Sequence, residues 1–359
     1  MRRSFRAAGN IRSLPPALWD SPFLAACRGE RPRHAPVWLM RQAGRYMDHY
    51  RGWRAKRSFL ELCRDPAAAA EVTLYARRVL GVDAAIIFSD ILLILQALGL
   101  PLRYSPDDGP QLDRPIRSPV QIESLGEPVQ AADELAAVYD AVRLVAMGLE
   151  PGIPLIGFCG APFTLAAYAI EGGGSRSYAR TRQFMYRHSE AWHRLCQVLV
   201  AALARTLRQQ VDAGCSAVQI FDSWAGHLSR ADFAEFAAPH LRALAATVPE
   251  GVPVILFGHG TSHLIDLIAA CGADVVGLDQ ATDLSAGWRA AGGADRIAVQ
   301  GNLDPALLLG TPDRLAAGVA ALRSAGGGAP GHIVNLGHGV MKESDPDLAR
   351  RLVDLVHAW

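Results

Sequence analysis

The sequence predicts an α/β fold, a single (β/α)8 TIM barrel whose active-site cleft lies at the C-terminal ends of its strands. Eight short apolar segments, rich in β-branched residues, recur along the 359 residues as buried parallel strands do. Alanine- and leucine-rich segments of helical length lie between them, most clearly residues 191–213 and 231–247. A doubly wound open sheet is the alternative. Its cofactor-binding form places G-x-G-x-x-G after an early strand, whereas residues 326–331 match late and precede a strand.

The expected strands follow one another at fairly regular intervals. In chain order they are residues 36–40, 84–88, 154–158, 217–221, 253–257, 275–278, 297–300 and 332–336. Because a barrel of this size folds as one unit, we expect one catalytic domain at residues 20–359. Residues 1–19 are expected to be an N-terminal arm, because their arginines are not followed by the apolar segment of a secretory signal.

Composition excludes several classes of function. The 36 basic and 35 acidic residues give a net charge of +1, so we expect no nucleic-acid partner. The long uncharged segment at residues 151–170 contains prolines and glycines, which argues against a membrane span. The six cysteines form no C-x-x-C pair, so we expect reduced thiols and a cytoplasmic protein.

Two arginines follow the first expected strand. Arg41 and Arg45 share one face if this segment is helical, and if it is a loop Gly44 lets them converge. Paired guanidinium groups suit a substrate with several carboxylates, although a solvated surface pair is the alternative. We expect substrate to bind along Arg41, Gln42, Ala43, Gly44 and Arg45.

An aspartate and a tyrosine follow the next two strands. Asp90 either caps a helix or acts as a carboxylate at the barrel mouth, where it binds N–H donors or stabilises a cation. Tyr168 lies on a helix that ends before Gly172, and is either a core aromatic or a hydroxyl directed into the pocket.

The later strands end in further polar residues. Ser223 either donates to a substrate carboxylate or caps a helix; a hydrolase pair with His227 is disfavoured, because no G-x-S-x-G surrounds it. Asn302 or Asp304 is expected to cap the helix after the seventh strand. His338, between glycines after the eighth strand, either contacts the ligand or is a surface turn residue.

A metal site is not expected. His259 could begin a zinc site of the H-x-C type, but threonine stands at position 261, and Cys271 has no partner at useful spacing.

Taken together, these segments resemble the uroporphyrinogen decarboxylase family from about residue 20 to the C-terminus. The resemblance is carried by PVWLMRQAGRYMDHYR, FSDIL, GAPFTLAAYAIEGGGS, FDSWAGHL, QGNLDP and NLGHG. It implies a (β/α)8 barrel, a homodimer, and decarboxylation of the four acetate side chains of uroporphyrinogen III. The products are coproporphyrinogen III and four CO2, in haem biosynthesis, with no cofactor and no metal.

The resemblance also implies roles for individual residues. Arg41 and Arg45 meet the substrate carboxylates, Asp90 lies at the centre, and Tyr168, Ser223 and His338 surround the pocket. The hypothesis is that a pyrrole protonated at a ring carbon takes up the electrons of the departing CO2, while Asp90 stabilises the resulting cation. Arg41, His338 or bound water is the proton donor.

The sequence departs from the family pattern at four positions. Tyr75 stands where glutamine is common, Leu95 where proline is common, His259 where lysine is frequent and Gln280 where tryptophan is frequent. The alternative is therefore a divergent paralogue, either similar to the corrinoid methyltransferases or a non-catalytic tetrapyrrole binder.

Overall fold

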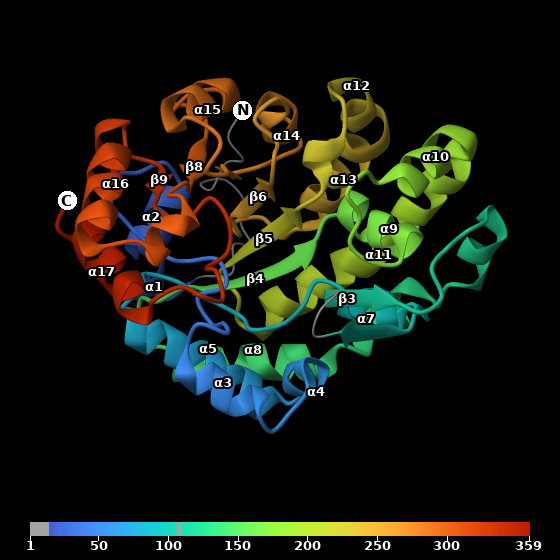
Figure 1. Cartoon of the computed structure of the whole chain (residues 1–359), viewed down its shortest axis with the longest axis horizontal. Coiled ribbons are helices and arrows are strands. Elements are labelled where there is room, and N and C mark those ends of the chain that lie inside the picture. Colours follow the sequence, from blue (N-terminus) through green and yellow to red (C-terminus); the bar gives the residue numbers. More distant parts are fainter. Residues whose placement is uncertain (1–13, 106–108) are drawn as a thin grey trace.

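The computed structural model describes residues 14–105 and 109–359. A curled, seven-stranded sheet lies at the centre, with helices packed around it (Figure 1). Every neighbouring pair of strands in this sheet is parallel. The strands, in their spatial order, are β1 (Ala85–Ile86), β4 (Leu155–Gly160), β5 (Ala217–Asp222), β6 (Val254–Gly258), β7 (Val275–Gly277), β8 (Ala298–Gln300) and β9 (His332–Ile333).

Helices connect and cover these strands. Many begin at a proline in the first turn, where the missing N–H costs no helical hydrogen bond. The α-helices are α1 (Pro16–Trp19), α2 (Pro22–Cys27), α3 (Asp48–Arg54), α4 (Phe59–Arg64), α5 (Pro66–Leu80), α6 (Leu93–Ala97), α7 (Pro128–Asp133), α8 (Ala136–Gly148), α9 (Pro162–Glu171), α10 (Ala179–Arg187), α11 (Ser189–Ala213), α12 (Arg230–Asp232), α13 (Ala238–Thr247), α14 (Ile265–Ala269), α15 (Leu284–Ala291), α16 (Pro312–Ser324) and α17 (Pro346–His357). Short 3₁₀ helices are η1 (Pro119–Ser124), η2 (Ala225–His227) and η4 (Pro305–Leu309).

Seven of the eight expected strands are confirmed within a few residues of their predicted ends, and the first is not a strand. In residues 36–40 only Val37 pairs, through an isolated parallel bridge to Val334. Pro36 has no N–H to give, and the Val37 N–H donates to the Asp83 carboxylate (2.8 Å) instead of to a backbone carbonyl. On the other side, the Asp83 N–H donates to the Val37 carbonyl (2.8 Å). This segment therefore lies between β9 and the residues that lead into β1.

Two other elements differ from expectation. Residues 191–213 are helical as predicted, but residues 231–247 are broken by a π-helical turn, η3 (Phe233–Ala237), before α13. Pro239 at the start of α13 cannot donate a backbone hydrogen bond, which explains the widened turn. The antiparallel hairpin of β2 (Leu102–Ser105) and β3 (Gly109–Leu112) was not predicted.

The interior of the sheet is mostly apolar and is crossed by one chain of polar side chains. Trp38 Nε1 donates to Gln300 Oε1 (2.9 Å), and Gln300 Nε2 donates to Gln219 Oε1 (3.0 Å). All three side chains are buried, so these bonds satisfy polar atoms that water cannot reach. These hydrogen bonds join the segment before Arg41 to β5 and β8. They therefore hold in place the strands whose C-terminal ends lead into the loops of the candidate site.

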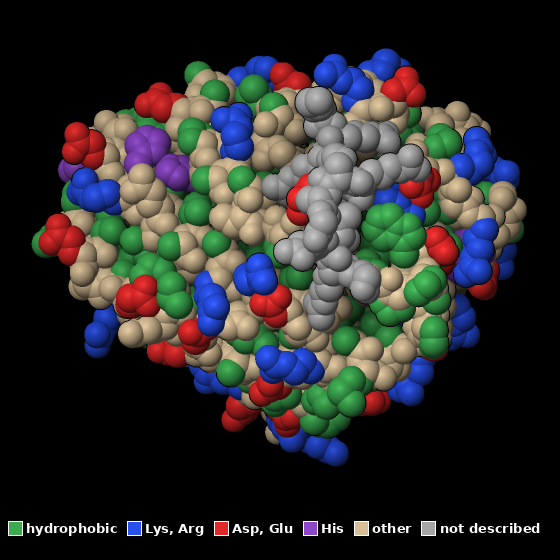
Figure 2. Space-filling model, turned by 180° about the vertical axis from the view of Figure 1, so that it is seen from behind, with side chains coloured by type: hydrophobic (Ala, Val, Ile, Leu, Met, Phe, Trp, Pro, Cys, Tyr) green, Lys and Arg blue, Asp and Glu red, His purple; other side chains and the backbone are tan. Residues whose placement is uncertain are grey.

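The N-terminal part of the described chain packs on the rest of the molecule, and the surface carries charges of both signs (Figure 2). Most of the expected arm lies outside the described residues, but its last part forms α1, and the Trp19 carbonyl accepts a hydrogen bond from Arg28 (3.0 Å). None of the described helices is long and apolar enough to cross a bilayer. On the face seen in Figure 2, acidic and basic side chains are interspersed.

Candidate active site

A tight turn follows Val37 and presents Arg41. Arg41 has a left-handed backbone (φ +61°), and the loop alternative for residues 41–45 is the one observed. Gln42 is buried: its Oε1 accepts from the Leu39 N–H (3.3 Å), and its Nε2 donates to the Ala84 carbonyl (3.4 Å). The turn is thereby fixed against β1, while the Arg41 side chain is left exposed.

The rest of this turn consists of Ala43, Gly44 and Arg45. Arg45 is exposed, and its carbonyl accepts from Arg51 (2.9 Å). Burial raises the pKa of Tyr50, in α3, to about 12, and the charges of Arg54 and then of Arg45 oppose that rise. Ala43 is half-buried, and a side chain at Gly44 would sit 3.1 Å from the Arg41 carbonyl oxygen, so this glycine allows the turn to close. The same loop therefore presents both Arg41 and Arg45 to solvent.

Asp90 follows β1, one residue beyond Ser89. Its Oδ1 accepts a hydrogen bond from the Leu92 N–H (2.7 Å) and so closes a turn just before α6. Asp90 does not cap this helix, because Leu92 is its N-cap. Burial raises the pKa of the Asp90 carboxyl; the Tyr104 hydroxyl, the Leu92 N–H and the Arg41 guanidinium oppose that rise. Asp90 is thus a carboxylate in apolar surroundings that faces an arginine.

Tyr104 comes from the β2–β3 hairpin, which was not predicted from the sequence. Its hydroxyl is buried and has no hydrogen bond of ordinary geometry, and its ring packs against Phe59 (4.7 Å between ring centres). Burial and then the Asp90 charge raise the pKa of this phenol. A single tyrosine in a short strand carries no signal in the sequence that would have linked it to Asp90.

An aromatic wall stands beside these groups. Tyr168 in α9 stacks on Trp224 (3.7 Å between ring centres, 29° between planes), and Tyr178 also packs against Trp224 (4.7 Å between ring centres). Burial raises the pKa of Tyr168, the charge on Asp90 raises it further, and Arg41 opposes. Trp224 could have been found from its position directly after Ser223; Tyr178 could not, because its loop has no regular pattern.

The turn after β5 is held by a buried carboxylate. Asp222 Oδ1 accepts from the Thr164 hydroxyl (2.6 Å), and Thr164 Oγ1 accepts from the Trp224 N–H (3.2 Å). Burial raises the pKa of Asp222 to about 6. Ser223 lies half-buried between these two residues and caps no helix, since Trp224 is the N-cap of η2.

Two histidines, one after β6 and one after β9, meet beside Arg41. The ring centres of His338 and His259 are 5.0 Å apart, with the planes at 74°. Burial, then the charges of Arg41 and His259, lower the pKa of His338 to about 4, so this ring is neutral at pH 7. His259 also approaches the buried Asp279 (3.9 Å between Nδ1 and Oδ2), whose Oδ2 accepts from the Gly260 N–H (2.5 Å).

Arg41 links these groups. Its charge opposes the rise that burial gives to the pKa of Asp90 and of Tyr168, and it adds to the fall that burial gives to the pKa of His338. These three residues come from three different strand ends. Gly339 explains how Arg41 fits: a Cβ there would lie 2.4 Å from Arg41 Cδ. The structure therefore brings Arg41, Asp90, Tyr168 and His338 together, with Ser223 next to the Tyr168–Trp224 stack, whereas no hydrogen bond or ion pair joins Arg45 to these groups among the described residues.

Asp304 follows β8, the seventh expected strand, and is the residue that caps the next helix, η4. Its Oδ1 accepts from the Ala306 N–H (2.9 Å) at the start of η4. Asn302 instead donates to the carbonyls of Asp279 (2.7 Å) and Thr282 (2.6 Å), and so ties the loops after β7 and β8 together.

The sequence and the fold were compared with known proteins. The model of the family described as "Uroporphyrinogen decarboxylase (URO-D)" matches residues 19–359. The chain is 44% identical to the uroporphyrinogen decarboxylase of Carboxydothermus hydrogenoformans, over 94% of this chain and 96% of that protein. It is 46% identical to the uroporphyrinogen decarboxylase of Chloroflexus aggregans, over 94% and 95% respectively.

Solved structures share the fold at much lower identity. A methyltransferase from Methanosarcina mazei superposes with a TM-score of 0.80 at 18% identity, over 94% of this chain and 98% of that one. A B12-independent methionine synthase from Shewanella sp. W3-18-1 gives a TM-score of 0.52 at 10% identity, over 83% and 89%. These two likenesses concern the fold alone.

Proposed function

This chain belongs to the uroporphyrinogen decarboxylase family, and from this premise we propose that it is a carboxy-lyase acting on uroporphyrinogen III. It removes CO2 from the four acetate side chains and gives coproporphyrinogen III, in tetrapyrrole and haem biosynthesis. The observation that carries the proposal is the convergence of Arg41, Asp90, Tyr168 and His338 at the C-terminal edge of the parallel sheet, in a chain that matches the family over residues 19–359.

The charge pattern supports this substrate. Uroporphyrinogen carries carboxylates at its periphery and four pyrrole N–H groups at its centre. Arg41 and Arg45, both exposed, supply cations for the carboxylates, and Asp90 supplies an anion for the N–H groups. Gln42 is engaged with the Leu39 N–H and the Ala84 carbonyl, so we assign it to holding the Arg41 turn, with Ala43 and Gly44 lining it through their backbone.

The chemistry needs a cation to form and to be stabilised. A proton added to a pyrrole ring carbon makes the ring an electron sink, and the electron pair of the bond to the acetate carboxyl moves into the ring as CO2 leaves. A second proton adds to the exocyclic carbon and makes the methyl group, and loss of the first proton restores the pyrrole. Each acetate thus exchanges CO2 for one proton. The Asp90 carboxylate stabilises the cationic ring through its N–H group, and does so strongly because its surroundings are apolar.

The neighbouring groups take supporting roles. His338 is neutral at pH 7, so it serves as a hydrogen-bond donor to a substrate carboxylate. Few His338 side chains carry the extra proton at this pH, which makes the residue a poor proton donor. Ser223 donates its hydroxyl to a carboxylate, and the Tyr168–Trp224 stack forms the wall against which a pyrrole lies. Arg41 steers the departing carboxylate.

The fold completes the proposal. Residues 36–38 bond to Val334 on one side and to Asp83 on the other. We propose that they act as the one strand that the seven-stranded sheet lacks and so close a (β/α)8 barrel. Residues 20–359 form this barrel as one domain. We further propose a cytoplasmic homodimer that binds no nucleic acid. Six buried cysteine thiols and a net charge of +1 support the compartment and the lack of a polyanion. Sedimentation of the purified chain tests the dimer.

An anaerobic assay tests the function. Wild-type protein is incubated with uroporphyrinogen III, and the products are oxidised and separated by chromatography, beside Asp90→Asn as the control. Stepwise appearance of products with seven to four carboxyls in the wild type alone supports the proposal. Correctly folded wild-type protein that binds the tetrapyrrole but converts none of it would overturn it in favour of a non-catalytic binder.

A further inference from the structure

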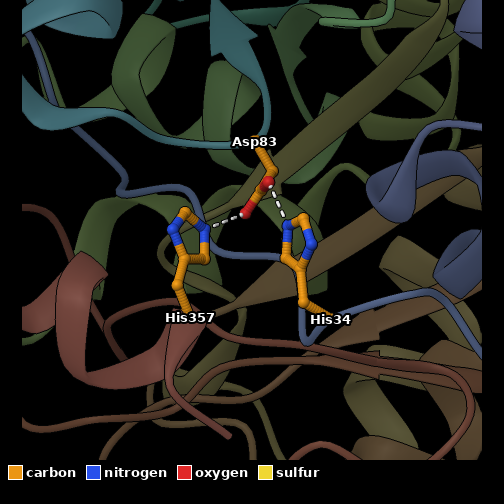
Figure 3. A group of neighbouring side chains, drawn as sticks. All are labelled: His34, Asp83 and His357. Carbon is orange, nitrogen blue, oxygen red and sulfur yellow. Dashed lines mark hydrogen bonds and ion pairs between the residues drawn. The ribbon is translucent and has the colours of Figure 1, made fainter.

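Three ligand-type side chains meet at the edge of the sheet opposite to Arg41 and Asp90. His34 precedes the Val37 bridge and Asp83 precedes β1, whereas the residues of the proposed active site follow the strands. His357 is the last residue of α17. Figure 3 shows both imidazoles directed at the same carboxylate. His34 Nε2 lies 2.7 Å from Asp83 Oδ1, and His357 Nε2 lies 2.8 Å from Asp83 Oδ2.

The cluster is positioned by the fold and is open to solvent. Asp83 is held by the Val37 N–H (2.8 Å), and its side chain is 9% exposed. The His34 and His357 side chains are 24% and 33% exposed, and their rings meet edge to face, 4.8 Å between centres. The carboxylate is therefore fixed, while the two rings can rotate and an ion can enter between them.

We propose that His34, Asp83 and His357 bind a divalent transition-metal ion, zinc before others, as a structural site. Two imidazole nitrogens and a carboxylate oxygen are a donor set that zinc takes. The three ligand atoms already lie within 4.8 Å of one another. A tetrahedral zinc with bonds of ~2.0–2.2 Å holds its ligand atoms about 3.4 Å apart, so modest ring rotations complete the site.

The ion replaces the present hydrogen bonds. An Nε2 that carries a proton donates to Asp83, and an Nε2 that binds zinc cannot, so each ring moves its proton to Nδ1, which the solvent can reach. Asp354, one turn before His357, adds a second negative charge that acts on this imidazole. The bound ion would join His357 of α17 to His34, before Val37, and to Asp83, before β1. It would therefore tie the C-terminal helix to the sheet.

Zinc titration of the chelator-treated full-length chain, in competition with a chromophoric chelator, tests the proposal. We expect one zinc per chain and a rise of a few degrees in the unfolding temperature when zinc is added. His34→Gln and His357→Gln keep a polar side chain but remove the imidazole; each weakens zinc binding by about 10–100-fold or more and removes the thermal shift. Mg²⁺, which prefers oxygen ligands, gives neither effect.

A matched control comes from the same chain. His193 pairs with His240 (2.8 Å between ring nitrogens) away from this cluster, and His193→Ala retains zinc binding in full. The proposal is overturned if the wild type binds no stoichiometric zinc, if the two glutamine variants bind it as well as the wild type, or if Mg²⁺ stabilises the chain equally. The cluster would then be a hydrogen-bonded clamp only.

Discussion

Gly339 gives the sharpest prediction about Arg41. The three heavy atoms nearest to a Cβ at this position all belong to Arg41: Cδ at 2.4 Å, Cγ at 2.7 Å and Nε at 2.9 Å. Carbon atoms in contact lie ~3.5–4.0 Å apart, so Gly339→Ala forces the Arg41 side chain to recede by about 1 Å. Displacements of this size cost about 10²-fold in rate, or ~2.7 kcal/mol of transition-state stabilisation.

The fold is expected to survive this change. The clash is with a flexible and exposed side chain, so the unfolding temperature of Gly339→Ala stays close to that of the wild type. Gly52→Ala is the matched control: Gly52 lies inside α3 with nothing within 4 Å of its added Cβ, and the change leaves activity intact and stabilises the chain by about 0.5–1 kcal/mol. The assay is kcat/KM for uroporphyrinogen III under anaerobic conditions. Wild-type kcat/KM in Gly339→Ala would refute the reasoning that the position of the Arg41 guanidinium limits catalysis.

Three further predictions concern charge. Asp90→Asn lowers kcat by about 10²–10³-fold and leaves tetrapyrrole binding largely intact, which fluorescence titration measures; equal losses in binding and turnover would argue against a role in the transition state. Tyr104→Phe removes a hydroxyl that holds the pKa of Asp90 down, so the acid limb of the kcat/KM profile moves to higher pH, and an unmoved limb would remove Tyr104 from the site. Asp83 raises the pKa of His357, so the stabilisation that this pair contributes is full below the unfolded-state pKa of ~6.5 and is lost as pH rises through the folded-state pKa. In urea unfolding without metal, His357→Ala is therefore more destabilising at pH 6 than at pH 9, and equal losses at both values would contradict the linkage.

Much of the fold was predictable because parallel strands buried on both faces are apolar and stand out in the sequence. β5 and β6 were predicted to within one residue of each end, and the strand order follows from consecutive parallel connections. The first expected strand was wrong because an aspartate side chain, distant in sequence, takes the hydrogen bond that a backbone carbonyl would accept. The helix at residues 231–247 was predicted without its π turn, because periodicity does not register one changed hydrogen-bond step at Pro239.

The site was predictable where residues directly follow strands. The positions of Arg41, Asp90, Ser223 and His338 after their strands were visible in the sequence, although their roles there came from the resemblance. Tyr104 and Tyr178 were not visible, because a hairpin and an irregular loop bring them in and only tertiary structure places them beside Asp90 and Trp224. The cluster of His34, Asp83 and His357 escaped notice for the same reason: its members are widely separated in the chain and share no motif.

We propose that this chain exchanges the four acetate carboxyls of uroporphyrinogen III for protons, with no metal ion or cofactor taking part in the reaction. The most direct measurement is the amount of CO2 released per uroporphyrinogen III by chelator-treated protein, with the tetrapyrrole product identified by mass spectrometry. We expect four CO2 and coproporphyrinogen III. Tight binding of unchanged uroporphyrinogen with no CO2, from protein that is folded by circular dichroism, would contradict this proposal.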